Sequence, residues 1–88
     1  MIRRYIRFFG QVQGVGFRYK CHYLAREYGI TGWISNLFDG SVEGEFQGAR
    51  DDIDALVYRL DNDIYISIEK MERKEIPLEE SEYNFEIR

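Results

Sequence analysis

The segment GQVQGVGFRYK, residues 10–20, joins a strand-like stretch to a helix-like one and organises the rest of the chain around it. It contains glycines at positions 10, 14 and 16, followed by an aromatic residue, Phe17, and a basic one, Arg18. Glycine tolerates positive φ angles and lets other atoms approach the backbone closely. Clustered glycines before a helix therefore indicate exposed N–H groups that converge on a ligand, and we expect an anion.

The residues before and after this segment have different hydrophobic periodicities, that of a strand before it and that of a helix after it. Residues 3–9, RRYIRFF, alternate and are rich in aromatic and β-branched side chains, which favours a strand. After the glycines, apolar residues recur at helix spacing: Phe17, Cys21, Leu24 and Tyr28. Gly29 is typical of a helix C-terminus, so the pattern predicts a helix over residues 17–28.

The middle of the chain reads as a hairpin followed by a second helix. Residues 30–48 contain two β-type runs on either side of Asp39-Gly40, a dipeptide suited to the positive φ angles of a two-residue turn. Residues 51–61 place apolar side chains at helix spacing and acidic ones near the helix N-terminus, where negative charge is favourable.

Two alternating stretches near the end of the chain predict further strands. Their apolar residues are Ile64, Ile66 and Ile68 in the first, and Tyr83, Phe85 and Ile87 in the second. The resulting order is β-α-β-β-α-β with a short final strand. Two helices on one face of a mostly antiparallel sheet form a ferredoxin-like α+β sandwich, which is the fold we expect.

Composition sets limits on the class of protein. We expect residues 1–88 to form a single domain, because the length and the 44% hydrophobic content are ordinary for one globular core. Cys21 is the only cysteine, which excludes an intrachain disulfide and fits a reducing compartment. No apolar run approaches the roughly 20 residues that span a bilayer, and no signal-peptide pattern is present. We therefore expect a cytoplasmic protein without membrane contact.

The formal net charge of −4 is distributed unevenly. Residues 1–44 hold six Lys/Arg and three acidic side chains, whereas residues 45–88 hold six and thirteen. Most of this surface would repel a polyanion such as nucleic acid, but one locally positive region can attract a small anion. The acidic half on its own is typical of a solvated surface.

The glycines and Arg18 are the first candidate site. Gly14, Val15 and Gly16 lie at the predicted strand-to-helix junction, where unsatisfied N–H groups and the helix dipole favour an anion. The Arg18 guanidinium can hold two phosphate oxygens at once. The segment lacks the Gly-Lys-Ser/Thr of a P-loop and has Tyr19 where a dinucleotide site has its third glycine, so a single small phosphate fits better than a nucleotide. The alternative is a glycine-rich connection with a solvated arginine.

Asn36, in GWISNL, is the second candidate. Asparagine is disfavoured inside an otherwise apolar strand, and an antiparallel fold can bring the second strand beside the first, near the glycine loop. Its amide can both donate to a phosphate and accept from a water. The alternative is that Asn36 only prepares the Asp39-Gly40 turn.

Few other residues are available for chemistry. Cys21 lies on the predicted buried face of the helix and His22 is the only histidine, so neither a cysteine–histidine pair nor a serine–histidine–carboxylate set is expected. No spacing of His, Asp or Glu indicates a metal site. Phosphoryl transfer needs mainly positioning and charge stabilisation, and a carboxylate leaving group with a pKa of roughly 4 needs no general acid. Hydrolysis of an acyl phosphate by a positioned water therefore fits best.

The run GQVQGVGFR, with Asn36 eighteen residues after Arg18 in TGWISNLFDGSVE, resembles the acylphosphatase family. The resemblance covers the whole chain, including the closing YNFEIR. It implies that Arg18 binds the substrate phosphate, that Asn36 orients the attacking water, and that Gly14 to Phe17 cradle the phosphate. It also implies hydrolysis of acyl phosphates to a carboxylate and inorganic phosphate without metal, cofactor or covalent intermediate, and we expect a monomer.

Two positions depart from the family pattern. Ser35 stands where a basic residue is frequent before the asparagine, and RLDNDIYISI lacks the Gly-Pro often found between the second helix and the next strand. Neither departure falls on Arg18 or Asn36. We expect them to affect substrate preference and turnover rate more than the activity itself.

Two other functions fit parts of the sequence. GVGFRY superficially resembles the glycine-aromatic signature of RNA-recognition motifs, which share this fold, but that signature belongs on a strand and here it precedes a helix. The chain also resembles the acylphosphatase-like part of larger carbamoyl-transfer proteins such as hydrogenase-maturation factors. It carries none of the cysteine-rich zinc-binding sequence that follows in those proteins, which favours a standalone enzyme.

Overall fold

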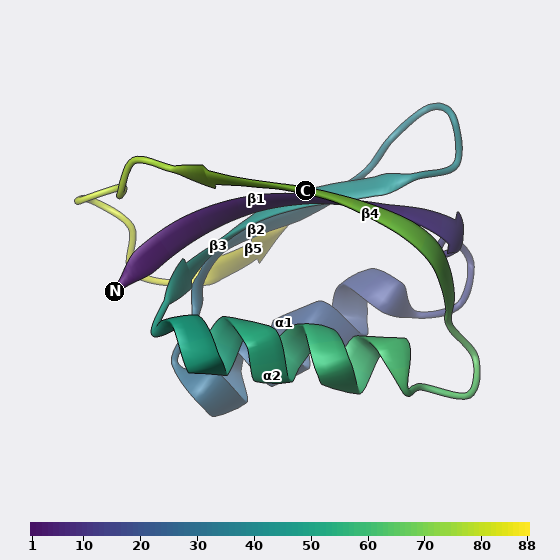
Figure 1. The fold of residues 1–88 in the computed structure, drawn as a ribbon, viewed down its shortest axis with the longest axis horizontal. Coiled ribbons are helices and arrows are strands. Elements are labelled where there is room, and N and C mark those ends of the chain that lie inside the picture. The colour runs from purple at the N-terminus through teal and green to yellow at the C-terminus, as the bar shows by residue number, and fades with distance from the viewer.

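The elements follow in the order β1 (Ile2–Gln11), α1 (Phe17–Tyr28), β2 (Thr31–Asn36), β3 (Val42–Gly48), α2 (Arg50–Asp61), β4 (Ser67–Ile76) and β5 (Phe85–Ile87). The computed structural model describes residues 1–88. The strands form one sheet in the order β4-β1-β3-β2-β5, with β5 parallel to β2 and all other pairs antiparallel. Both helices cover the same face of this sheet, and its other face is open (Figure 1). The predicted ferredoxin-like α+β fold is confirmed, with β5 as a short added edge strand.

Alternation along β1 divides its side chains between the two faces of the sheet. Ile6 and Phe8 are fully buried on the helix-covered face. Tyr5, which precedes Ile6 in sequence, points to the open face, where its hydroxyl donates to Glu43 of β3 over 2.8 Å. The strand predicted from RRYIRFF is therefore confirmed, and its side chains alternate between the two faces as expected of a strand.

Four phenylalanine rings from four elements meet in the core between sheet and helices. Phe8 of β1 lies edge-on to Phe17 of α1, with ring centroids 4.9 Å apart, and to Phe46 of β3 at 6.3 Å. Phe46 packs in turn against Phe85 of β5, with centroids 5.5 Å apart. Because Phe17 is the first residue of α1, this aromatic cluster fixes where the helix starts and where the preceding loop lies.

Helix α1 has the bounds predicted from the sequence. Gly16 and Gly29 flank it with φ angles of 76° and 68°, in the left-handed region that glycine adopts without strain. The buried residues of α1 are Phe17, Cys21, Leu24 and Ala25. Helix α2 begins at Arg50, one residue before the predicted start. Neither helix is long and apolar enough to cross a membrane.

The hairpin between β2 and β3 is confirmed, but the two-residue turn predicted on Asp39-Gly40 is wrong. The N–H of Leu37 donates to the carbonyl of Ser41 over 2.8 Å, and the N–H of Gly40 donates to the carbonyl of Leu37 over 3.2 Å. Three residues therefore form the loop, and only the glycine has a positive φ, 93°. Asp39 keeps a negative φ because its carboxylate accepts hydrogen bonds from the N–H and hydroxyl of Ser41, which favours the longer loop.

Three residues predicted to belong to strands lie outside them: Ile64, Ile66 and Tyr83. Ile66 immediately precedes β4 and is buried. Ile64 is 87% exposed, because the Asp63 carboxylate accepts a hydrogen bond from the N–H of Tyr65 and closes a turn before β4 begins. Tyr83 is 90% exposed, because the pairing of β5 with β2 begins only at Phe85. In both places the alternating apolar pattern continues beyond the ladder hydrogen bonds.

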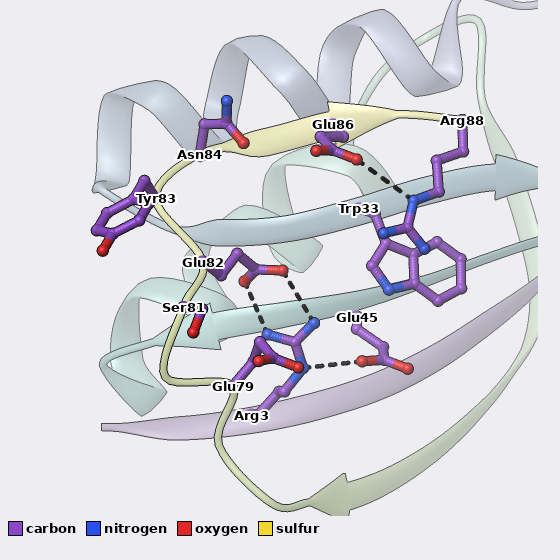
Figure 2. A pocket seen from close by; sticks show the side chains of 10 residues that line it. All are labelled: Arg3, Trp33, Glu45, Glu79, Ser81, Glu82, Tyr83, Asn84, Glu86 and Arg88. Atoms are coloured by element: carbon purple, nitrogen blue, oxygen red, sulfur yellow. Dashed lines mark hydrogen bonds and ion pairs between the residues drawn. The ribbon is translucent and has the colours of Figure 1, made fainter.

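Arg3 joins the two ends of the chain on the open face of the sheet. It is only 4% exposed, and its guanidinium lies between the carboxylates of Glu45 and Glu82, at 2.8 and 2.7 Å (Figure 2). Burial is the largest single influence on the pKa of Glu82 and raises it, but the hydrogen bonds from Arg3 and Thr31 together with the positive charges of Arg3 and Arg88 outweigh burial, so the pKa lies below the ordinary value. The segment before β5 is thereby held against β1 and β3.

Candidate functional site

The loop between β1 and α1, the first turn of α1 and the end of β2 enclose a cavity of about 160 Å³. Its lining residues are Val12, Gln13, Gly14, Gly16, Phe17, Arg18, Tyr19 and Asn36. Of the candidates from the sequence, the structure brings together Gly14, Gly16, Phe17, Arg18 and Asn36. Val15 belongs to the same loop but does not line the cavity. Figure 1 shows the β2–β3 turn and the end of β1 at the same end of the molecule.

The loop conformation depends on two glycines. Gly14 and Gly16 have φ angles of 74° and 76°, and an added Cβ at either position would meet no atom within 4 Å. Glycine is therefore required here by the backbone conformation and not by lack of space. The loop turns through these two residues into the N-terminus of α1.

The N-terminus of α1 is left uncompensated by the protein. No side chain caps it, and its first turn contains no acidic residue. The free N–H groups of this turn and the positive end of the helix dipole therefore face the cavity without a protein partner. An anion of the size of phosphate is the complement to this end of the helix.

Arg18 is not paired with any acidic side chain. None of the ion pairs of the chain involves Arg18. Its guanidinium donates one hydrogen bond, from Nη1 to the backbone carbonyl oxygen of Arg88 over 3.1 Å. This contact orients the side chain and leaves its remaining N–H donors available.

Asn36 is the last residue of β2 and lies opposite Val42 of β3. Its side-chain amide has no partner within the chain, and only its backbone carbonyl accepts from a side chain, the hydroxyl of Ser35 at 3.3 Å. The turn that follows is closed by Leu37, Gly40 and Ser41 without this amide. The amide of Asn36 is therefore available to the cavity and is not used to hold the turn.

Gln13 connects the glycine loop to the hairpin that carries Asn36. Its Nε2 donates to the carbonyl oxygens of Leu37, at 2.8 Å, and Ser41, at 2.9 Å. These two bonds fix the distance between the loop and the end of β2. No pattern in the sequence marks Gln13 as a functional residue, because its partners are backbone atoms of a hairpin 24 and 28 residues away.

The β2–β3 turn, to which Gln13 donates its hydrogen bonds, is stabilised by the charged side chain of Asp39. The Asp39 carboxylate accepts from the hydroxyl and N–H of Ser41 and from Nη2 of Arg7. These contacts, led by the Ser41 hydroxyl, lower the pKa of Asp39 to about 2. The carbonyl acceptors of Gln13 are therefore part of a fixed turn.

The charges around the cavity favour an anion. Its lining contains one basic residue, Arg18, and no acidic one. A larger hollow of about 490 Å³ lies on the open face of the sheet, but four of its lining residues are glutamates: Glu45, Glu79, Glu82 and Glu86 (Figure 2). An anionic ligand would be repelled there, so the smaller cavity is the candidate site.

The remaining candidates for chemistry lie elsewhere. Cys21 is fully buried and burial raises the pKa of its thiol, so it remains protonated and inert. His22 does not line the cavity. The GVGFRY run lies in the loop and first turn of α1 and not on a strand, so it does not form the stacking surface of an RNA-recognition motif.

Comparison with known proteins gives consistent results. The sequence model of the acylphosphatase family matches residues 4–87. An acylphosphatase of Trichormus variabilis is 49% identical over 57 residues, which are 65% of this chain and 56% of that protein. An acylphosphatase of Clostridium acetobutylicum is 36% identical over 99% of this chain and 98% of its own length. The chain thus spans little more than half of the first relative and nearly all of the second.

Solved structures agree with the sequence comparisons. The crystal structure of acylphosphatase from Bacillus subtilis superimposes with a TM-score of 0.91 at 29% identity, over 100% of this chain and 99% of that one. HypF of T. kodakarensis matches with a TM-score of 0.85 at 31% identity, over 100% of this chain but 12% of that one. With a family match over almost every residue, the chain belongs to the acylphosphatase family.

Proposed function

We propose that residues 1–88 form a catalytic unit that hydrolyses acyl phosphates to a carboxylate and inorganic phosphate. The observation that carries this proposal is that the glycine loop, Arg18 and Asn36 together line one cavity, whose lining contains no acidic residue. The relatives from Trichormus variabilis and Clostridium acetobutylicum are both named acylphosphatases, which supports the same reaction.

The loop and Arg18 bind the phosphoryl group. Backbone N–H groups of Gly14 to Phe17 and the N-terminus of α1 donate to its oxygens, and Arg18 holds two of them through its fork of N–H donors. Because these donors are already oriented, they stabilise the charge that shifts onto the phosphoryl oxygens in the transition state without further rearrangement. The Arg88 carbonyl keeps the guanidinium in place while it does so.

Asn36 holds the water that attacks the phosphorus. Its free amide can accept from the water and donate to a phosphoryl oxygen. The bond from the water oxygen to phosphorus forms as the bond from phosphorus to the acyl oxygen breaks, and the carboxylate leaves with the electron pair. A phosphoryl oxygen takes the proton of the water. The carboxylate needs no protonation because its conjugate acid has a pKa of roughly 4.

No protein nucleophile or metal ion is needed for this sequence of steps. None of the lining residues is a cysteine, histidine or carboxylate that could form a covalent phosphoenzyme. The bound substrate phosphate supplies its own base. The rate enhancement comes from positioning and from fixed positive charge, which are the main contributions that phosphoryl transfer requires.

Hydrolysis of benzoyl phosphate, followed by the loss of ultraviolet absorbance in the presence of EDTA, tests the proposal. We expect rapid cleavage of benzoyl phosphate, no cleavage of a simple alkyl phosphate, and loss of activity in Arg18→Ala. A folded protein that cleaves neither compound would overturn the proposed reaction. Inhibition by EDTA would contradict the metal-free mechanism.

A further inference from the structure

Tyr19 is the one aromatic side chain of the cavity that is not part of the core. It is 72% exposed, whereas Phe17, which also lines the cavity, is 2% exposed and packs on Phe8. Two residues correspond to about 200° around an α-helix, so Tyr19 leaves α1 on the side away from the sheet. A helical side chain also leans towards the N-terminus of its helix, which carries the ring over the mouth of the cavity.

Asn36 reaches the same cavity from the opposite direction. It ends β2 and therefore lies in the sheet layer, whereas Tyr19 lies on the solvent side of the helix layer. Both residues line the cavity at the start of α1, where the phosphoryl group would be held. In an in-line displacement the leaving group departs on the side opposite the attacking water. If the water is at Asn36, the acyl group extends towards Tyr19.

We infer that Tyr19 forms the acyl-group subsite and favours acyl phosphates whose acyl part is aromatic or broadly apolar. This inference rests on the proposed hydrolase function and adds the substrate class to it. The ring offers a flat apolar surface to the acyl group, while its exposure lets acyl groups of different length extend into solvent. The subsite therefore favours an acyl group that packs against the Tyr19 ring, and it does not surround that group in a closed pocket.

The test compares two substrates that differ only in the acyl group. Benzoyl phosphate and acetyl phosphate are given to the unchanged protein and to Tyr19→Ala, Tyr19→Phe and Tyr23→Ala. Tyr23 is the matched control, because it lies one turn further along α1, is 60% exposed and does not line the cavity. The measured quantity is the ratio of kcat/KM for benzoyl phosphate to that for acetyl phosphate.

We expect Tyr19→Ala to lower this ratio by roughly three- to tenfold, the effect of one aromatic contact. Tyr19→Phe should keep the ratio, because the ring and not the hydroxyl makes the contact, and Tyr23→Ala should leave it unchanged. Inhibition by inorganic phosphate should be the same in all four proteins. An equal loss for both substrates in Tyr19→Ala, or a Phe variant that behaves like the Ala variant, would overturn the inference.

A binding measurement separates this inference from the hydrolase function. Phosphonates in which a methylene replaces the bridging oxygen of benzoyl phosphate or acetyl phosphate cannot be hydrolysed, and calorimetry gives their affinities without turnover. We expect the benzoyl analogue to bind more tightly than the acetyl analogue, with the difference lost in Tyr19→Ala. Equal affinities would overturn the subsite even if hydrolysis occurs. If the protein binds the benzoyl analogue more tightly than the acetyl analogue but hydrolyses neither substrate, only the proposed function is overturned.

Discussion

Nη1 of Arg18 lies 3.1 Å from the backbone carbonyl oxygen of Arg88, so the start of α1 is held by the residue that follows β5. The two residues are 70 positions apart in sequence. β5 is therefore more than an added edge strand: its end supplies an acceptor that orients the cationic side chain of the cavity. The acceptor belongs to the main chain, so it does not depend on the side chain at position 88.

Removal of Arg88 should lower kcat, whereas Arg88→Ala should not. The deletion removes the acceptor of Arg18 and the hydrogen bond from the N–H of Arg88 to Ile34, while the substitution keeps both. A small misplacement of a positioning group costs up to roughly 100-fold in rate, and we expect on the order of tenfold here. Steady-state kinetics with benzoyl phosphate measures the effect. Equal activity of the deletion and Arg88→Ala would show that the contact has no role.

Arg18→Ala should lose at least about 100-fold in kcat/KM, because it removes the only fixed charge of the cavity. Arg18→Lys should recover only part of the lost kcat/KM. The ammonium restores the positive charge, but it cannot hold two phosphoryl oxygens at once. Thermal unfolding should change little in either variant, because Arg18 forms no ion pair and its one hydrogen bond, to the carbonyl of Arg88, is exposed to solvent. Inhibition by inorganic phosphate should weaken in step with kcat/KM, and unchanged inhibition in Arg18→Ala would contradict the assignment.

Asn36→Ala should separate binding from turnover. We expect it to bind inorganic phosphate about as well as the unchanged protein, because the loop and Arg18 remain, and to lower kcat on the order of 100-fold because the water is no longer held. Ser35→Ala is the control, since that side chain contacts only the backbone carbonyl of Asn36. Near-normal turnover by Asn36→Ala would remove the water-positioning role.

Gln13→Ala should affect both stability and rate. It removes the donors to Leu37 and Ser41 and should lower the free energy of unfolding by about 1–3 kcal/mol. The loop would also lose its fixed distance to Asn36, so kcat should fall. Gln11→Ala is the control, because Gln11 is exposed at the end of β1. Chemical denaturation and steady-state kinetics of the two variants give both readings.

The turn at Asp39 should make stability sensitive to acid. The pKa of Asp39 is lowered from 3.8 to about 2, so the stabilisation from its ionised form is fully present above pH 4 and is lost as the pH falls towards 2. Asp39→Asn should therefore be less stable than the unchanged protein at pH 6, with a difference that shrinks below pH 4. Urea denaturation across this range measures it, and a constant difference would show that Asp39 is not the group responsible.

Local patterns in the sequence predict most of the fold. They succeed where the residues that determine a helix or strand lie within it or directly beside it. The bounds of α1 follow from Gly16, Gly29 and the apolar spacing between them. The prediction is wrong where a short-range polar contact competes with the pattern, as at Asp39, whose bonds to Ser41 lengthen the turn, and at Asp63, which closes a turn where Ile64 suggested a strand.

For the candidate site, residue types could be predicted but the connections between them could not. Arg18 and Asn36 stand out because arginine beside glycines and asparagine in an apolar strand are unusual. The support from Gln13 and from the Arg88 carbonyl depends on backbone atoms that any sequence would supply. The direction of Tyr19 depends on the start of α1, which the packing of the Phe17 ring in the core determines.

The contact of Arg3 with Glu82 joins residues 79 positions apart, and contacts of such long sequence separation influence how fast the chain folds. β1 lies inside the sheet, yet both of its partner strands follow it at long sequence separation, since Ile2 pairs with Gly48 and Arg3 with Ile76. Loops of this length must close before the first strand gains any ladder hydrogen bonds, and that loss of chain entropy slows folding. The chain should therefore refold in milliseconds to seconds, slower than a helical bundle of the same length.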